Sequence, residues 1–221
     1  MPPADKALEA TARSRARTFP EEVGIALSAV DCMLNGDKAV YASSDLTTGR
    51  RFYRLLRESE ARYPEGLRTK LGAEAYRRRL FEPNAEAANA FARSLRDLLG
   101  GRTLVITPAP LRVPDWSQDE YLGFFEALIR TRIHAAYFND GWEYSNGCTF
   151  EFVVAQEAGV PTFDARGVPL DRGTALVLGE RAVTELQASG IEPVGLQQHY
   201  TRLRRLGELR PAPEGPARSS L

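Results

Sequence analysis

Short apolar runs alternate with helical patterns along most of this chain, and no other feature constrains the fold as strongly. The candidate strands are residues 40–43, 103–107, 133–138, 162–164 and 175–178. Helical patterns separate them, near residues 49–62, 85–99, 118–131 and 146–158. Strands that alternate with helices form mainly parallel sheets with helices on both faces. We therefore expect an α/β fold, a Rossmann-like or flavodoxin-like three-layer sandwich with a sheet of about five strands.

The chain has 221 residues, of which 43% are hydrophobic, and this is enough for one domain with a substantial core. We expect that domain to span residues 38–208. Residues 1–37 read as an N-terminal extension with one added helix, near residues 18–36. Residues 209–221 are rich in proline and polar residues, a composition typical of a disordered tail.

Charge and composition exclude several classes of function. Lys plus Arg equals Asp plus Glu at 29 each, so no overall basic field favours polymeric nucleic acid. The cluster Arg77-Arg78-Arg79 is interpreted as a solvated helix face. No apolar run reaches membrane-spanning length, and the N-terminus lacks the apolar core of a secretory signal. Two cysteines form no disulfide framework, so we expect a cytoplasmic protein.

We expect no metal and no cofactor. The only histidines are His134 and His199, and no cysteine stands at zinc-ligand spacing from either. The chain also lacks the glycine-rich loop that holds triphosphates and the Gly-x-Ser-x-Gly turn of serine hydrolases.

The segment from Asn139 to Glu151, NDGWEYSNGCTFE, carries most of the functional information. It places Asp140 after a predicted strand and Glu151 inside the following helix, so we expect the two carboxylates to converge on one pocket. Ser145 is the predicted N-cap of that helix. Ser145, Cys148 and Glu151 then lie three residues apart on one face. Gly147 lets a ligand approach the backbone at the helix N-terminus, which favours negative charge.

A second segment, residues 38–50, has the sequence KAVYASSDLTTGR. It contains the first predicted strand and the loop that follows it. In a parallel sheet the loops after the first and third strands lie at carboxyl ends, where such folds bind ligands. Both segments therefore belong to one expected site.

The spacing from Asp140 to Glu151 resembles the signature of the nucleoside 2-deoxyribosyltransferase-like superfamily, which includes nucleoside deoxyribosyltransferases and nucleoside 5′-monophosphate N-glycosidases. Residues 38–50 resemble that family's first strand and its glycine-ending loop, and the likeness covers roughly residues 38–170. The transferases usually carry Asp where this chain has Ser145. The monophosphate glycosidases have Ser there to hold phosphate, so the resemblance favours a nucleotide.

The resemblance also implies roles for individual residues. Glu151 is implied to be the nucleophile that attacks the anomeric carbon, Asp140 to assist the departing base, and Tyr41 to belong to the catalytic set. The implied substrate-binding residues are Ser44, Asp45, Gly49, Arg50, Gly141, Trp142, Ser145 and Gly147. Family members usually assemble as homodimers or higher oligomers, so the resemblance implies the same here.

The chemistry also follows from residue types. Cleavage of an N-glycosidic bond develops positive charge on the sugar, and an ionised carboxylate can stabilise or capture it. We therefore expect cleavage or transfer at the N-glycosidic bond of a nucleoside or nucleoside 5′-monophosphate. The alternative is a nucleotide-binding sensor or regulatory module of the same fold that has no turnover.

Overall fold

The computed structural model describes residues 18–61, 64–113 and 116–208. The chain divides into two compact units between Asp37 and Lys38. The described part of the first unit is helix α2 (Phe19–Leu34), where the Glu21 carboxylate accepts a 2.7 Å hydrogen bond from the Thr18 amide. The helix ends at Asn35, whose left-handed backbone (φ 49°) stops it. The tail expected over residues 209–221 lies outside the described residues.

The second unit is built on a four-stranded, all-parallel sheet, which confirms the α/β class. The strands are β1 (Ala39–Ser43), β2 (Val105–Ile106), β3 (Ile133–Phe138) and β4 (Thr162–Asp164). Their order is β2-β1-β3-β4, so β1 and β3 are central neighbours. Tyr41 pairs in register with Ala136, and Ala136 with Thr162. The carboxyl ends of β1 and β3 therefore meet at the point where the strand order reverses, the usual ligand site of such sheets.

The fifth expected strand is a helix, and this prediction was wrong. Residues 175–178 lie inside α9 (Arg172–Ala188), which begins where Asp171 accepts a 2.7 Å hydrogen bond from the Thr174 amide. The buried positions of this helix are Ala175, Gly179, Ala182 and Leu186. Their spacing of three or four residues is helical, and it outweighs the short apolar run that suggested a strand.

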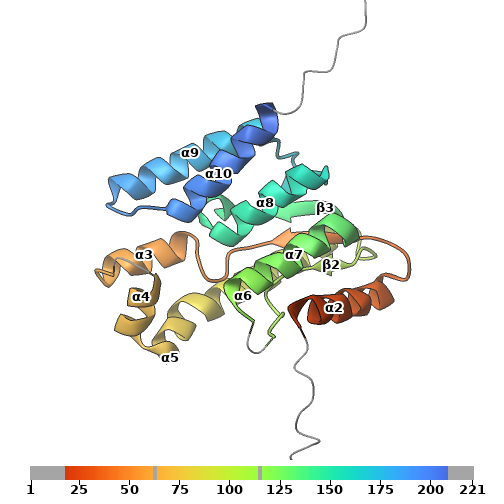
Figure 1. Ribbon diagram of the computed structural model, residues 1–221, viewed down its shortest axis with the longest axis horizontal. Coiled ribbons are helices and arrows are strands. Elements are labelled where there is room, and N and C mark those ends of the chain that lie inside the picture. The colour runs from red at the N-terminus through yellow and green to blue at the C-terminus, as the bar shows by residue number, and fades with distance from the viewer. Residues whose placement is uncertain (1–17, 62–63, 114–115, 209–221) are drawn as a thin grey trace, which may run out of the picture. The chain divides into compact units, whose positions relative to one another are not determined.

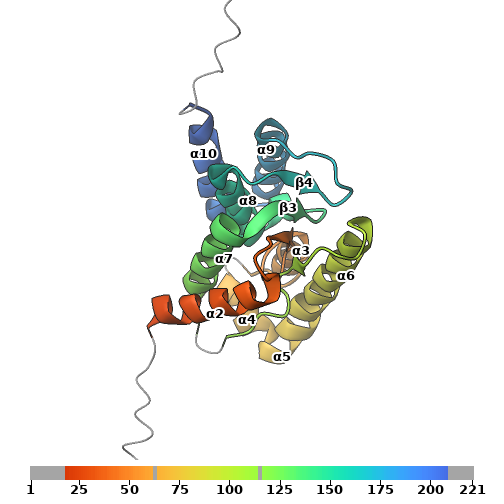
Figure 2. The same ribbon diagram turned by 90° about the vertical axis from the view of Figure 1, so that its right-hand side faces the viewer.

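Helices cover both faces of the sheet (Figures 1 and 2). Helix α6 (Glu82–Leu98) packs on the face that carries Val40 and Ala42, in a buried cluster with Phe91, Leu95 and Val105. The opposite face carries the alternate β1 side chains and is covered by α7 (Gln118–Arg132) and α8 (Asn146–Ala158). Helix α10 (Val194–Glu208) packs against both α8 and α9.

A run of short helices follows β1. It comprises α3 (Arg50–Glu58), α4 (Pro64–Leu71), α5 (Ala73–Tyr76) and the π-helical turn η1 (Arg77–Phe81), which continues directly into α6. Arg77, Arg78 and Arg79 are exposed on η1, as expected of a solvated face. The aromatic side chain that ends this turn, Phe81, contributes to the site described below.

Local sequence signals set the ends of α7 and α8. The Ser117 hydroxyl accepts a hydrogen bond from the Glu120 amide, and the Glu120 carboxylate accepts one from the Ser117 amide, which together form a capping box. Helix α8 begins after Ser145 and ends at Gly159, whose φ of 68° is left-handed.

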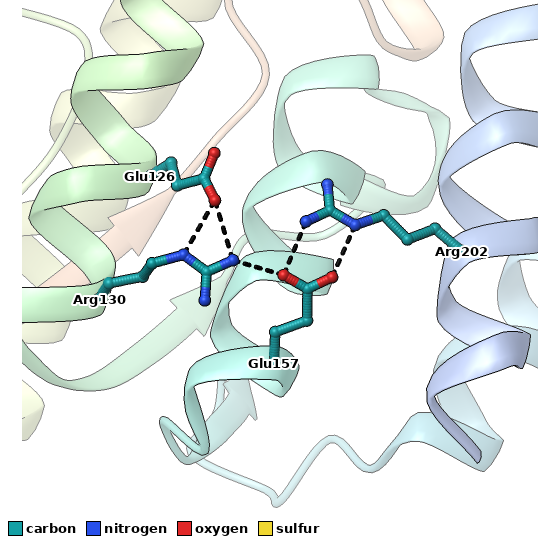
Figure 3. A network of polar contacts seen from close by, with 4 residues as sticks. All are labelled: Glu126, Arg130, Glu157 and Arg202. Atoms are coloured by element: carbon teal, nitrogen blue, oxygen red, sulfur yellow. Dashed lines mark hydrogen bonds and ion pairs between the residues drawn. The ribbon is translucent and has the colours of Figure 1, made fainter. Parts of the chain in front are cut away.

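A network of charged side chains joins α7, α8 and α10 (Figure 3). Glu157 on α8 accepts two 2.6 Å hydrogen bonds from Arg202 on α10. It also accepts one from Arg130 on α7, and Arg130 in turn pairs with Glu126. Among the helices of the described part, none is long and apolar enough to cross a membrane.

Candidate functional site

Glu151 is a buried carboxylate at the centre of the second unit. Its side chain extends from α8 to strand β1, where the Tyr41 hydroxyl donates to Oε1 at 2.8 Å and the Ser43 hydroxyl donates to Oε2 at 2.5 Å. Tyr41 and Ser43 share one face of β1 because side chains two residues apart on a strand point the same way. Glu151 is 4% exposed, and both donors are fully buried. The strand thus holds both carboxylate oxygens in place.

Burial controls the protonation of this group. Removal of the carboxylate from water raises the pKa of Glu151 to about 7, although the hydrogen bonds from Ser43 and Tyr41 act in the opposite direction. The pKa of Tyr41 is also raised, first by burial and then by the neighbouring Glu151 charge, so its hydroxyl stays protonated. Near neutral pH both forms of Glu151 are populated.

Glu151 lines a cavity of about 520 Å³ at the carboxyl ends of β1, β2 and β3. A small-molecule site typically has roughly 300–1,000 Å³, so the cavity suits a ligand of nucleotide size. One wall is polar and is made by the loop after β1 and the start of α8. The members of this polar wall are Ser44, Thr47, Thr48, Ser145, Gly147, Cys148 and Glu151.

The other wall is largely apolar and comes from three separate segments. Phe81 reaches it from η1, and further lining residues come from the loop after β2, between 108 and 113, and from the first turns of α7. The apolar members are Phe81, Pro108, Leu111, Val113, Tyr121, Leu122 and Phe125. A site with one polar wall and one aromatic wall suits a ligand that joins a flat ring to a hydroxyl-rich or anionic part.

The start of α8 is tied to the loop after β1. The Ser145 hydroxyl accepts from the Cys148 amide at 3.4 Å and lies 3.2 Å from the Thr48 hydroxyl. Thr48 also accepts from the Asn146 amide at 3.1 Å. The Ser44 hydroxyl is buried on the same wall and has no hydrogen-bond partner within the described residues.

The structure does not bring Asp140 into this cavity, contrary to expectation. Asp140 is exposed and lines a separate hollow with Asp45, Arg50 and Arg54. After Asp140, the left-handed backbone of Gly141 (φ 85°) turns the chain into the short helix η2 (Trp142–Tyr144), which separates Asp140 from the start of α8. Sequence spacing alone does not reveal that turn.

Arg50 also lies outside the cavity. Its guanidinium makes a 2.9 Å ion pair with Glu143 and stacks 4.6 Å from the centre of the Tyr144 ring. A Cβ added at Gly141 would lie 3.4 Å from the Arg50 side chain, so the two segments are in close contact. Arg50 therefore connects the start of α3 to η2.

Of the other residues expected to bind substrate, some line the cavity and some belong to the structure around it. Ser44, Ser145 and Gly147 line the cavity. Gly49 is structural, because a Cβ there would lie 2.2 Å from the Asp45 carboxylate and the backbone is left-handed (φ 110°). Trp142 is buried and stacks on Phe152 with ring centres 4.8 Å apart, so it belongs to the core.

Several residues that contact Glu151 or line the cavity were not expected from the sequence. Ser43 carries a detectable signal, since it stands two residues after Tyr41 on the same strand face. Phe81, Arg112 and Tyr121 carry none, because only the tertiary fold brings η1, the loop after β2 and α7 to one cavity. Within the described ranges, no group of three or more His, Cys, Asp or Glu side chains is placed to hold a metal ion.

No protein-family model matches this chain, and no curated protein or solved structure matches it. Fold and site therefore define a class only: an α/β protein with a parallel sheet and a buried carboxylate in a cavity at its carboxyl edge.

Proposed function

We propose that this protein cleaves or transfers at the N-glycosidic bond of a nucleoside or nucleoside 5′-monophosphate, with Glu151 as the nucleophile. The observation that carries the proposal is the setting of Glu151. It is a buried carboxylate, held by Tyr41 and Ser43 and exposed only toward a cavity of nucleotide size.

The proposed reaction has two steps. A Glu151 oxygen attacks the anomeric carbon, the bond from that carbon to the base nitrogen breaks, and the electron pair leaves with the base. The resulting glycosyl ester is attacked at the same carbon by water or by the nitrogen of a second base, which loses a proton to solvent and releases Glu151. Tyr41 and Ser43 are positioning residues, because their hydrogen bonds set the orientation of the carboxylate.

The polar wall is the proposed place for the sugar and its 5′-phosphate. The start of α8, with the Gly147 amide and the hydroxyls of Ser145 and Thr48, favours an anion. The proposal leaves out Arg50 and Asp140, since both side chains line other hollows. Assembly as a homodimer or larger oligomer stays a prediction from the family resemblance.

The test is base release from ribo- and deoxyribonucleosides and their 5′-monophosphates, with and without an acceptor base. We expect release by the wild type, a loss of at least about a thousandfold in Glu151→Gln, and a faster rate for monophosphates. The rate should rise with pH through about 7, because only the ionised Glu151 attacks.

Glu180→Gln is the matched control, since Glu180 is an exposed carboxylate on α9 that pairs with Arg204. Nucleotide binding without base release would favour the alternative, a nucleotide-binding module. Release that is unchanged in Glu151→Gln would refute the proposed nucleophile.

A further inference from the structure

Arg112 is the one cationic side chain among the described residues that line the cavity of Glu151. It lies in the loop after β2, is exposed, and stands on the largely apolar wall. The polar wall already holds the groups suited to sugar and phosphate. A cation on the largely apolar wall needs a different explanation.

The flat face of the Arg112 guanidinium packs on an aromatic ring. Its central carbon lies 4.8 Å from the centre of the Phe81 ring, in a stacked cation–π contact. Within residues 18–61, 64–113 and 116–208, no carboxylate forms an ion pair with it. A guanidinium stacked in this way keeps its edge free, and that edge presents parallel N–H donors.

The backbone next to Arg112 is fixed. The Tyr121 hydroxyl accepts from the Val113 amide at 2.8 Å and donates to the Val113 carbonyl at 3.0 Å. These two bonds anchor the loop to α7 and use the one proton of the Tyr121 hydroxyl. The largely apolar wall therefore has an anchored main chain and one charged side chain, whose guanidinium N–H groups have no partner among the described residues.

We propose that Arg112 binds the leaving base, and that the base is a 6-oxopurine such as hypoxanthine or guanine. This inference rests on the proposed function. A guanidinium edge matches the adjacent O6 and N7 acceptors of a 6-oxopurine with two hydrogen bonds, whereas adenine places an amino donor where O6 would be. The aromatic side chains of Phe81, Tyr121 and Phe125 suit the flat bicyclic ring.

Arg112 also answers a chemical need of the proposed reaction. The base departs with the electron pair of the broken bond, and negative charge spreads onto N7 and O6. The guanidinium stabilises that charge by hydrogen bonding without giving up its proton, because arginine stays protonated in proteins. The departed base then takes a proton from water.

The experiment is equilibrium binding of free hypoxanthine and free adenine to the full chain, followed by binding of inosine and inosine 5′-monophosphate. We expect the wild type to prefer hypoxanthine over adenine. Arg112→Gln should weaken hypoxanthine binding roughly tenfold to a hundredfold and leave adenine nearly unchanged. Arg112→Lys, which keeps the charge but loses the paired donors, should recover only part of the affinity.

Arg204→Gln is the matched control, since Arg204 is an exposed arginine whose partner is Glu180. The preference should survive in Glu151→Gln, so that the base site and the proposed chemistry are tested separately. Equal affinity for both bases, or no binding of either, would overturn the inference. An effect of Arg112→Gln confined to inosine 5′-monophosphate would also overturn it, because Arg112 would then be a phosphate contact.

Discussion

The position and the pKa of Glu151 depend on the strand that faces it and on burial. Tyr41 and Ser43 each direct one hydroxyl at the carboxylate, and yet burial keeps the pKa of Glu151 near 7. The ionised form is therefore costly in the folded protein. If Glu151 had only a structural role, a glutamine would serve better, because its side chain does not ionise. The presence of an ionisable carboxyl at this buried position is therefore a reason to test for function.

The raised pKa of Glu151 makes a prediction for stability. A carboxyl whose pKa is raised from 4.5 to about 7 on folding contributes stability below pH 4.5 and loses it as pH rises through 7. Gln does not ionise, and it can accept from one hydroxyl while donating to the other. The stability of Glu151→Gln relative to wild type should therefore increase by up to about 3 kcal/mol between pH 5 and pH 8.5.

Urea unfolding of both proteins at several pH values measures this difference. Comparison with the wild type at each pH cancels the titration of all other groups. A difference that does not vary with pH would mean that Glu151 has the same pKa in the folded and unfolded chains.

At the scale of elements, the site depends on how η2 and the loop after β1 are held together. Arg50 joins them through its ion pair with Glu143 and its contact with the Tyr144 ring. The Tyr144 hydroxyl in turn donates to Glu185 at 2.5 Å, and Tyr200 donates to the Glu143 carbonyl at 3.0 Å. The segment that leads into Ser145 is thus fixed from α3, α9 and α10.

We predict that Arg50 acts on this segment and does not contact a phosphate. Arg50→Gln should raise KM for a nucleoside and for its 5′-monophosphate by the same factor, roughly threefold to tenfold, with kcat little changed. Arg50→Lys should not rescue KM fully, since an ammonium group cannot stack on Tyr144 as a guanidinium does.

A double-mutant cycle with Glu143→Gln provides the structural readout. Unfolding free energies should show a coupling of about 1 kcal/mol between the two residues. A rise in KM confined to the monophosphate would restore Arg50 as a phosphate contact and refute the structural assignment.

At the scale of the whole second unit, the helical layer that carries Glu151 is held by charge as well as by apolar packing. Glu157 lies between Arg202 and Arg130 and so joins α8 to both neighbouring helices (Figure 3). Burial raises the pKa of Glu157, but the hydrogen bonds from Arg202 and Arg130 outweigh that effect and the pKa lies below its usual value.

Glu157→Gln is expected to destabilise the fold by about 1–2 kcal/mol at pH 7, since Arg202 would lose its carboxylate partner and Arg130 would keep only Glu126. A depressed pKa contributes stability above the unfolded value and loses it as pH falls, so the difference from wild type should shrink near pH 3.5. Urea unfolding at both pH values measures it. Glu180→Gln, at an exposed pair, should cost less than about 0.5 kcal/mol, and an equal loss in both variants would contradict a special role for Glu157.

Local interactions explain which predictions from the sequence are confirmed. The ends of α8 follow from Ser145 and Gly159, and the start of α7 follows from Ser117 and Glu120, because a cap involves residues only a few positions apart. The face of α8 that carries Glu151 follows in the same way from helical spacing. The strand prediction for residues 175–178 was wrong because a four-residue apolar run fits a strand or a helix equally well. Only the helical spacing of buried residues over the longer segment distinguishes the two.

The sequence by itself therefore determined the α/β class, the places of the four parallel strands, and the N-capped helix that carries Glu151. Only the tertiary structure decided which side chains surround that carboxylate. Arg50 and Glu143 stand 93 positions apart, and the wall with Arg112 is assembled from η1, a loop and α7. Contacts between residues so far apart in the sequence depend on how the chain turns at residues such as Gly141 and on how the helices pack. No short-range sequence pattern encodes either.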